Sequence, residues 1–311
     1  MEFLYWLESI RNPVLDALMQ TVTHFGSEIL FIALGIFMLW CMDKKQGYFI
    51  LAVGFFGVYA NQFLKLLCRI PRPWMQDPEF TIVESARADA TGYSFPSGHT
   101  QTAVGSFFGL FLCRRELWLK ITCIALCVLV PLSRMYLGVH TPLDVGVAAL
   151  MAVVMALGLW YLFSRFGYVK KLMFPLMGGL SLLAVAFLLY TMLWQFPADI
   201  DPHNLASARE TSCTLLGALI GLWVTYLADE FKLHFDTKAP LAGQLLKFVI
   251  GIALVLLFME GSKPVFNLMF GEGSYVARVI RYALTVILAG VVWPLTFPVF
   301  QKIGEKKEFL A

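Results

Sequence analysis

Two histidines of this 311-residue chain stand in short polar segments beside long apolar runs, where they can take part in phosphate chemistry. The segment Pro96-Ser97-Gly98-His99 opens one such run, and its glycine allows the backbone to approach a ligand closely. The free N–H groups and the dipole at the start of a helix attract an anion. His99 is therefore placed to donate a proton beside a bound phosphate.

A second polar segment, residues 133–144, places His140 four residues before Asp144. On one helix these residues share a face, and a carboxylate there can hold the imidazole in one tautomer and stabilise its cation. Pro142 lies between them and favours a helix start, so this geometry is approximate. Arg134 has a planar guanidinium group that suits phosphate oxygens. Either segment alone is ambiguous, because a single histidine near a membrane surface is more often structural than catalytic.

The composition indicates which elements must position these residues. Apolar residues make up 59% of the chain and charged residues 14%, against about 25% charged residues in soluble proteins. These values exclude a soluble cytosolic enzyme and a disordered chain, and a net charge of +3 gives no sign of a nucleic-acid partner. We predict an all-α, polytopic helical membrane protein with about nine transmembrane helices. The predicted spans are 28–42, 47–67, 99–113, 117–132, 142–163, 172–194, 211–228, 245–259 and 277–300.

Basic residues between the predicted spans set an orientation. Most of them gather on one side: Lys44, Lys45, Arg114, Arg115, Lys120, Arg165, Lys170, Lys171, Lys302, Lys306 and Lys307. The positive-inside rule makes that side cytoplasmic. The segments that carry His99 and His140 then lie on the extracytoplasmic side.

The end of the second predicted span departs from this charge bias, because it carries Lys65, Arg69 and Arg72 on the outer side. Basic residues there either bind a phosphate or anchor lipid headgroups with snorkelling side chains. The polar loop that follows, residues 74–95, suits the wall of a site or a solvated connector.

These motifs together resemble the type 2 phosphatidic acid phosphatase superfamily, over roughly residues 24–166. The resemblance rests on Lys65, Arg72 and Pro73, then Pro96-Ser97-Gly98-His99, then Ser133, Arg134, His140 and Asp144. The superfamily includes lipid phosphate phosphatases, bacterial undecaprenyl-pyrophosphate and phosphatidylglycerophosphate phosphatases, glucose-6-phosphatase and vanadium haloperoxidases. We match no family pattern to the remaining C-terminal half.

The resemblance implies a role for each motif residue. His140 is the nucleophile that forms a phosphohistidine, Asp144 orients it, and His99 protonates the leaving oxygen. The phosphate oxygens are bound by Lys65, Arg72, Ser97, Gly98 and Arg134. Three cationic side chains can take the place of a metal, and no carboxylate cluster of magnesium-ligand type lies near the motifs. We therefore expect no metal and no cofactor.

The expected protein is an integral membrane phosphatase of a bacterial inner or plasma membrane, with its active site on the extracytoplasmic side. Its predicted parts are an interfacial amphipathic helix (1–24), a membrane phosphatase core built on six helices (25–168) and a C-terminal transmembrane extension of unknown role (169–311). Its expected partners are a lipid phosphate or polyprenyl pyrophosphate substrate and the bilayer. The C-terminal helices can widen a lipid groove or form the contact of a homodimer.

Three alternatives stay open. A phosphotransferase would pass the phosphoryl group to an acceptor other than water, and a sugar-phosphate phosphatase would act on a soluble substrate. A lipid transporter or flippase would use the same spans without chemistry. A haloperoxidase is disfavoured because those relatives are soluble.

Overall fold

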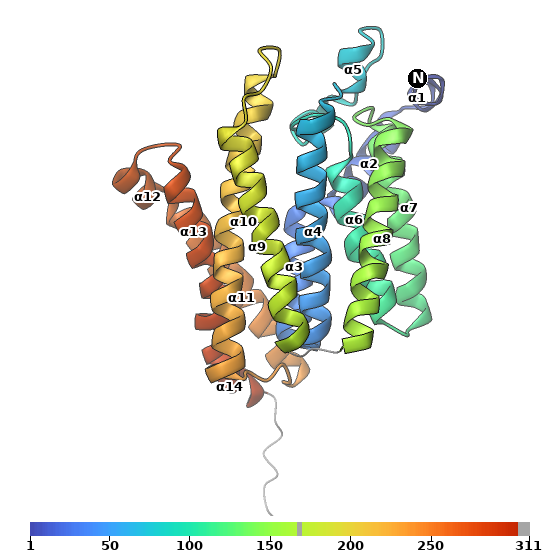
Figure 1. Cartoon of the computed structure of the whole chain (residues 1–311). Coiled ribbons are helices and arrows are strands. Elements are labelled where there is room, and N and C mark those ends of the chain that lie inside the picture. Colours follow the sequence, from blue (N-terminus) through green and yellow to red (C-terminus); the bar gives the residue numbers. More distant parts are fainter. Residues whose placement is uncertain (167–169, 304–311) are drawn as a thin grey trace, which may run out of the picture. The chain divides into compact units, whose positions relative to one another are not determined.

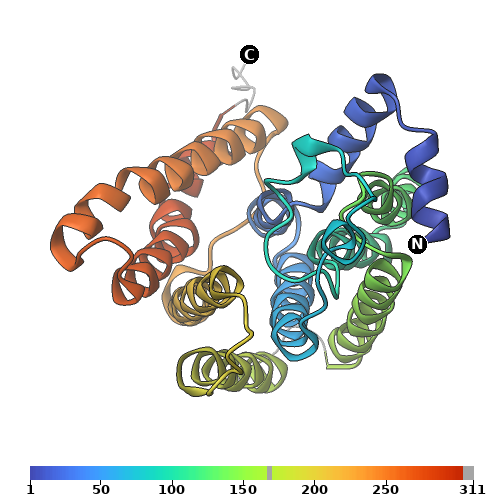
Figure 2. The same cartoon turned by 90° about the horizontal axis from the view of Figure 1, so that it is seen from above.

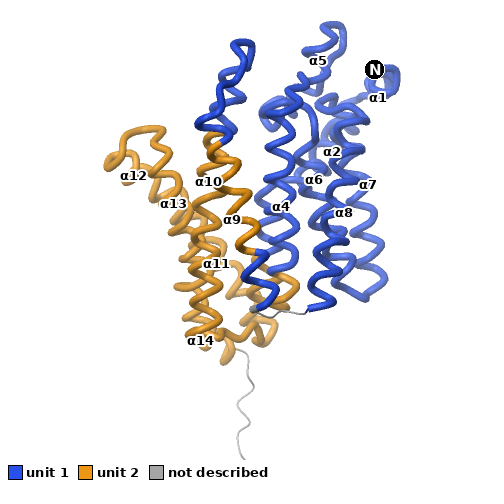
Figure 3. The backbone as a smooth tube through the Cα atoms, in the orientation of Figure 1, with its two compact units in different colours: residues 1–35, 48–176, 190–208 blue, residues 36–47, 177–189, 209–311 orange. Residues whose placement is uncertain are grey.

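The computed structural model of the chain describes residues 1–166 and 170–303, and the regular structure within these ranges is helical (Figure 1). The predicted all-α class is confirmed. The chain forms two compact units (Figure 3): unit 1 comprises residues 1–35, 48–176 and 190–208, and unit 2 comprises residues 36–47, 177–189 and 209–311. Lys306 and Lys307, which contribute to the predicted orientation, lie outside the described residues, as does the predicted domain boundary after residue 168.

Unit 1 holds the elements that carry the motifs. Its helices, whole or in large part, are α1 (Glu2–Ser9), α2 (Pro13–Thr23), α3 (Glu28–Phe37), α4 (Lys44–Cys68), α5 (Pro73–Gln76), α6 (Gly98–Cys113), α7 (Leu117–Tyr136) and α8 (Pro142–Phe166). The segment predicted as one amphipathic helix over 1–24 is divided into α1 and α2. Asn12 accepts hydrogen bonds from the N–H groups of Val14 and Leu15, and Pro13 occupies the first turn, so a new helix begins there.

Helix α6 is the central helix of unit 1. Ten of its sixteen residues are buried, and it packs against α7 and α8. Gly105 and Gly109 face Val53 and Phe49 of α4, and an added Cβ at Gly105 would lie only 3.2 Å from Val53 Cγ1. Small residues at such positions allow transmembrane helices to approach closely. Figure 2 shows the unit 1 helices end-on, with the loop between α5 and α6 crossing over their ends.

Seven helices within the described residues are long and apolar enough to cross a membrane. An eighth span is added if the bent pair Pro13–Gly26 and Glu28–Met42, which meet at 50°, counts as one. The seven are Lys44–Gln76, Leu117–Tyr136, Pro142–Phe166, Lys171–Leu193, Pro202–Leu233, Leu241–Phe270 and Tyr275–Gln301. The nine predicted spans are all helical, but the first forms part of the bent pair. The third corresponds to α6, whose 16 residues fall short of a full span.

Unit 2 is built mainly from the C-terminal helices. These are the larger parts of α9 (Lys170–Leu193) and α10 (Pro202–Ala228), then α11 (Leu241–Gly261), α12 (Lys263–Phe270), α13 (Tyr275–Ile287) and α14 (Phe297–Gln301). Two lysines of unit 2 have polar partners: Lys44 Nζ lies 2.7 Å from the Asp229 carboxylate, and the buried Lys247 donates to the Thr237 carbonyl. Paired charges of this kind can stay buried in an apolar bundle.

Candidate active site

The PSGH segment is joined to the start of α8 by a backbone hydrogen bond. Ser97 caps α6, its hydroxyl oxygen accepting from the Thr100 N–H, and its own N–H donates to the Asp144 carbonyl over 3.1 Å. Asn61 of α4 donates to the Pro96 carbonyl from the other side. The helix start that the sequence predicts as an anion site is therefore fixed to both α4 and α8.

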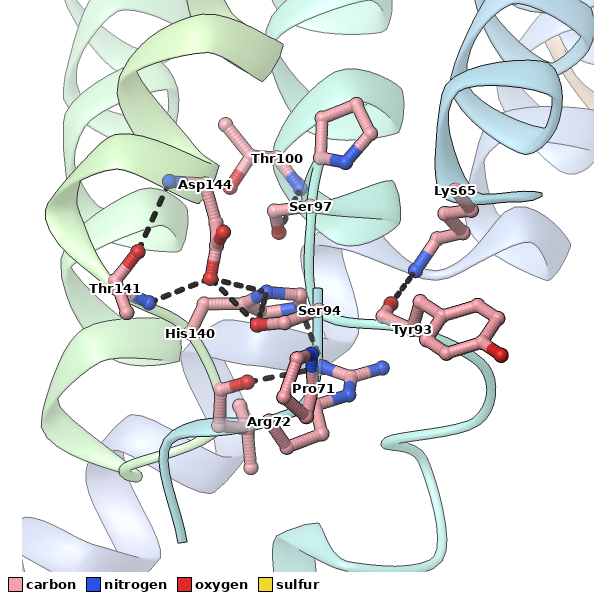
Figure 4. Close-up of polar contacts among 12 residues, drawn as sticks. Lys65, Pro71, Arg72, Tyr93, Ser94, Ser97, Thr100, His140, Thr141 and Asp144 are labelled. Atoms are coloured by element: carbon pink, nitrogen blue, oxygen red, sulfur yellow. Dashed lines mark hydrogen bonds and ion pairs between the residues drawn. The ribbon is translucent and has the colours of Figure 1, made fainter. Parts of the chain in front are cut away.

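His140 and Asp144 form the centre of the candidate site (Figure 4), and both are buried, with side chains only 1–2% exposed. His140 Nδ1 lies 3.4 Å from Asp144 Oδ2. The same oxygen accepts hydrogen bonds from Ser94 Oγ at 2.6 Å and from the Thr141 N–H at 2.7 Å. The four-residue spacing thus brings the carboxylate to the imidazole as predicted, and two further donors hold the carboxylate in place.

Arg72 lies against the opposite edge of the imidazole. Its Nη1 is 2.9 Å from His140 Nε2 and donates to the Val139 carbonyl over 2.9 Å. Its other nitrogens donate to the carbonyls of Gly92 and Thr91. Because an arginine can only donate, His140 Nε2 accepts this hydrogen bond, and Nδ1 carries the ring proton that faces the carboxylate.

Lys65 is buried at the end of α4, and its Nζ donates to the Tyr93 carbonyl. Tyr93 immediately precedes Ser94, whose hydroxyl binds Asp144. Lys65 is therefore one residue removed, along the α5–α6 loop, from the network around the carboxylate (Figure 4).

Arg134 is completely buried, yet only part of its guanidinium group is satisfied. Nη1 donates to Thr23 Oγ1 over 2.9 Å, whereas Nε and Nη2 have no hydrogen-bond partner among the residues the structure describes. Unpaired N–H groups of a buried cation are costly. An anion is the ligand that would satisfy them.

His99 lies beside the turn His24–Gly26, which directly follows Thr23, the residue that binds Arg134. Its backbone carbonyl and Cβ pack against Gly26, where an added Cβ would come within 2.7 Å of that carbonyl. Thr23, the partner of Arg134, is three residues before Gly26. Within residues 1–166, the structure shows no hydrogen bond between His99 and His140.

Burial and neighbouring positive charges both act on His140, which lies in the loop between α7 and α8. Burial of the imidazole, followed by the positive charge of Arg72, lowers the pKa of His140 well below its ordinary value. The charges of Arg134 and Lys65 act in the same direction, so both lie within electrostatic reach of the ring.

A cavity of about 380 Å³ adjoins Arg72. Arg69 stands at this cavity with a left-handed backbone (φ 52°), and its guanidinium lies 3.5 Å from the Asp199 carboxylate. The Tyr93 hydroxyl accepts from the Asp201 N–H, so the segment after α9 forms part of the wall. The lining residues are Cys68, Arg69, Pro71, Arg72, Met75, Gly92, Tyr93, Asp199, Asp201 and Asn204.

Several contacts of the site are missing from the sequence prediction. Ser94 lies in the loop predicted as a site wall, but a single serine has no spacing that marks it. Thr23 lies before the first motif, and Thr141 lies between the motif residues His140 and Asp144. Their roles depend on long-range packing, as with Thr23 and Arg134, which are 111 residues apart.

The described residues include no group of three or more His, Cys, Asp and Glu that could hold a metal ion.

Comparison with known proteins places the chain in a family. Residues 46–168 match the PAP2 superfamily, and residues 213–306 match the PAP2 superfamily phosphatase, transmembrane extension. The chain belongs to the PAP2 superfamily, as its motifs predict, and the relatives it matches are lipid phosphate and pyrophosphate phosphatases. The second match gives a family assignment to the C-terminal half, for which the sequence motifs offered none.

Three relatives illustrate the similarity. Undecaprenyl-diphosphatase BcrC of Bacillus subtilis is 30% identical over 162 residues, which cover 51% of this chain and 78% of the relative. Sphingosine-1-phosphate phosphatase 2 of Mus musculus is 25% identical over 273 residues, 81% of this chain and 73% of the relative. Phosphatidylglycerophosphatase B of Bacillus subtilis is 30% identical over 151 residues, 44% of this chain and 69% of the relative. The matched region covers between 58% and 78% of the length of such relatives. No solved structure gives a significant match.

Proposed function

We propose that this chain is an integral membrane phosphatase that hydrolyses a lipid phosphate or a polyprenyl pyrophosphate through a phosphohistidine at His140. The contact between His140 Nε2 and Arg72 Nη1, at 2.9 Å, is the main support. Since the Nδ1 proton faces Asp144, the lone pair of Nε2 points toward a cation that can also hold a phosphate. In the free protein that lone pair accepts the hydrogen bond from Arg72, so a bound phosphate must take over this donor before Nε2 can attack the phosphorus.

In the first step, His140 Nε2 forms a bond to phosphorus as the bond between phosphorus and the leaving oxygen breaks. His99 gives its proton to that oxygen. The leaving group is the lipid alcohol when the substrate is a monophosphate, and the lipid monophosphate when it is a diphosphate. The Asp144 carboxylate accepts a hydrogen bond from the Nδ1–H of His140, which keeps this proton on the imidazole. It also stabilises the positive charge that develops on the ring.

In the second step, a water molecule attacks the phosphohistidine. His99, now neutral, takes a proton from the water, and the bond between phosphorus and Nε2 breaks. Inorganic phosphate leaves, and His140 returns to its starting form with its proton on Nδ1.

Positive charge and N–H groups surround the transferred group and stabilise its transition state. We assign this role to Lys65, Arg72, Ser97, Gly98 and Arg134. Arg134 contributes its two unpartnered nitrogens. The Ser97 N–H is already bound to the Asp144 carbonyl, so Ser97 contributes its hydroxyl hydrogen. Three cations supply the charge that a metal supplies elsewhere, and we therefore propose metal-independent catalysis.

Two substrate classes are consistent with the family. The relatives include an undecaprenyl-diphosphatase, which matches 51% of the chain, and sphingosine-1-phosphate phosphatases, which match 81% or more in several cases. The cavity beside Arg72 provides space for the group attached to the phosphate. A phosphate ester or diphosphate of a long-chain lipid is therefore the substrate that we propose to test first.

The deciding experiment measures phosphate release by the purified chain in detergent with EDTA present. The substrates are undecaprenyl diphosphate, sphingosine 1-phosphate, phosphatidate and glucose 6-phosphate. We expect rapid release from at least one lipid, and a loss of several orders of magnitude in His140→Ala. The matched control is Arg114→Ala, because Arg114 pairs with Glu116 at the opposite end of α6 and should leave the rate unchanged.

Each alternative gives a different result. Normal phosphate release by His140→Ala would refute the phosphohistidine. Release that requires an added acceptor would indicate a phosphotransferase, and activity restricted to glucose 6-phosphate would indicate a sugar-phosphate phosphatase. Lipid movement that persists in His140→Ala without hydrolysis would indicate a transporter.

We further propose that the site faces the extracytoplasmic side of a bacterial inner or plasma membrane. Ser85, in the α5–α6 loop, and Lys45, at the opposite end of α4, are both exposed. In a Cys68→Ser background, Ser85→Cys should react with a membrane-impermeant maleimide in intact cells. Lys45→Cys should react only after permeabilisation, and the reverse pattern would contradict the orientation.

A further inference from the structure

The N-terminal helix α1 packs against α7 and shares an apolar cluster with the loop that carries His140, although α1 lies outside the residues that match the PAP2 superfamily. Leu4 and Leu7 of α1 are buried in one apolar cluster. The other buried members of this cluster come from the α5–α6 loop, the end of α7 and the α7–α8 loop: Phe80, Ile82, Ala86, Tyr136, Leu137 and Val139. Val139 directly precedes His140, so the apolar contacts of α1 reach the residue next to the proposed nucleophile.

Arg11, just after α1, is the polar centre of this packing, and its side chain is only 10% exposed. Its Nε donates to the Tyr136 carbonyl over 2.9 Å, and its Nη1 donates to the Thr81 carbonyl over 2.8 Å. One guanidinium group therefore joins the end of α7 to the α5–α6 loop. A planar fork is needed for this, because two acceptors on different segments are bound at once.

The α5–α6 loop is fixed to the same place by two further contacts. The Val83 N–H donates to the Leu137 carbonyl over 3.1 Å. The Glu8 carboxylate accepts from the Thr81 N–H over 3.0 Å. The last turn of α1, the loop at residues 81–83 and the end of α7 thus form one hydrogen-bonded assembly.

Gly138 shows how closely this assembly encloses the loop. Its backbone is left-handed (φ 82°), and an added Cβ would lie 2.8 Å from Arg11 Nη2 and 3.0 Å from the Thr81 carbonyl. Two residues after Gly138, His140 Nε2 contacts the guanidinium of Arg72. The Val139 carbonyl accepts a hydrogen bond from that Arg72 guanidinium as well. The position of Arg11 and the position of the imidazole are therefore linked through only four residues of backbone.

We infer that Arg11 is a positioning residue for the reaction, which holds the loop 137–141 so that the imidazole of His140 faces the bound phosphate. The inference rests on the proposed role of His140. Arg11 touches no group that we place on the phosphate, and it acts through the loop alone. A misplacement of about 1 Å at a reacting atom can lower a rate about 100-fold, so this support affects turnover more than binding.

The test compares Arg11→Ala, Arg11→Lys and the control Arg114→Ala as full-length proteins in detergent. The measurements are kcat and KM per folded molecule for sphingosine 1-phosphate and undecaprenyl diphosphate, and inhibition by inorganic phosphate. We expect Arg11→Ala to lower kcat about 10- to 100-fold, with KM and the phosphate inhibition constant changed less than about threefold. Arg11→Lys keeps one of the two donors and should recover part of kcat, and Arg114→Ala should match the wild type.

Wild-type kcat in both Arg11 variants would overturn the inference, as would a loss of activity that only follows the folded fraction. If Arg11→Ala does not fold, the kcat of Arg11→Lys per folded molecule decides. A parallel His140→Ala variant separates the two proposals. An active His140→Ala refutes the phosphohistidine, whereas an inactive His140→Ala with normal Arg11 variants refutes the positioning role alone.

Discussion

Replacing Ser94 by alanine removes one of the hydrogen bonds that hold Asp144 against His140. Ser94 Oγ donates to Asp144 Oδ2 over 2.6 Å, and the Thr141 N–H, at 2.7 Å, remains as a donor to the same oxygen. A hydrogen bond to a charged group contributes about 1.5–3 kcal/mol, which corresponds to about 10- to 150-fold in rate. Because the Thr141 bond persists, we expect the lower end, a loss of about tenfold in kcat/KM.

Initial rates of phosphate release on a lipid substrate measure this loss, with thermal unfolding followed in parallel. Ser106→Ala is the matched control. Ser106 is also a buried serine, and its hydroxyl donates to the Thr102 carbonyl inside α6, away from the site. This control should retain kcat/KM within about twofold.

A Ser94→Ala enzyme with kcat/KM within twofold of the wild type would refute the reasoning, and so would an equal loss in Ser106→Ala. A double-mutant cycle adds a second criterion. If Ser94 acts through the carboxylate, then Ser94→Ala should cost almost nothing further in an Asp144→Ala background. An undiminished tenfold loss in that background would show that Ser94 acts elsewhere.

Three other perturbations follow from the site. The lowered pKa of His140 keeps Nε2 unprotonated to lower pH, so kcat/KM should not decline as the pH falls through 6.5. A pH profile with its acid limb at 6.5 would contradict this. Arg134→Lys loses the two unpartnered donors and should lower kcat/KM about 100-fold while weakening inhibition by inorganic phosphate, as steady-state kinetics would measure. Gly138→Ala should destabilise the protein by about 1–3 kcal/mol in thermal unfolding, whereas Gly146→Ala, where an added Cβ meets nothing within 4 Å, should not.

The motif residues could be predicted because their chemistry and their spacing in the chain carry the information. The interval between His140 and Asp144 is one helical turn, and the structure brings the two side chains together. Arg72, which the motifs predict as a phosphate-binding residue, lies in direct contact with the imidazole, and its binding of phosphate stays a prediction. A buried cation near hydrocarbon is costly, so its presence in the sequence already indicated a site.

The supporting contacts could not be predicted, because each depends on how distant segments pack. Arg11 binds the carbonyl of Tyr136, and any residue type offers such a carbonyl. Ser94 and Thr23 are small hydroxyl residues that occur in any loop or helix, and only the fold gives them charged partners. The contribution of Asp199 to the cavity arises from a segment 130 residues away from Arg69.

The helix boundaries differ from the prediction for local reasons. Apolar periodicity continues across residues 10–13, but the Asn12 cap and Pro13 begin a new helix there. For α6 the predicted bounds, 99–113, agree with the structure to one residue, and only the assignment as a membrane span differs, because its 16 residues are too few for a full span. Hydropathy alone does not distinguish a helix enclosed by protein from one that faces lipid.

The enclosure of α6 has a consequence for how the enzyme meets membranes of different composition. At about 1.5 Å per residue, sixteen residues extend about 24 Å, less than the hydrocarbon thickness of about 30 Å. A lipid-facing helix of this length would have to thin the bilayer, but α6 is covered by its neighbours and bears no such mismatch. The depth of His99 is then set by contacts within the protein, so the geometry of the proposed catalytic residues should be the same in thick and thin bilayers.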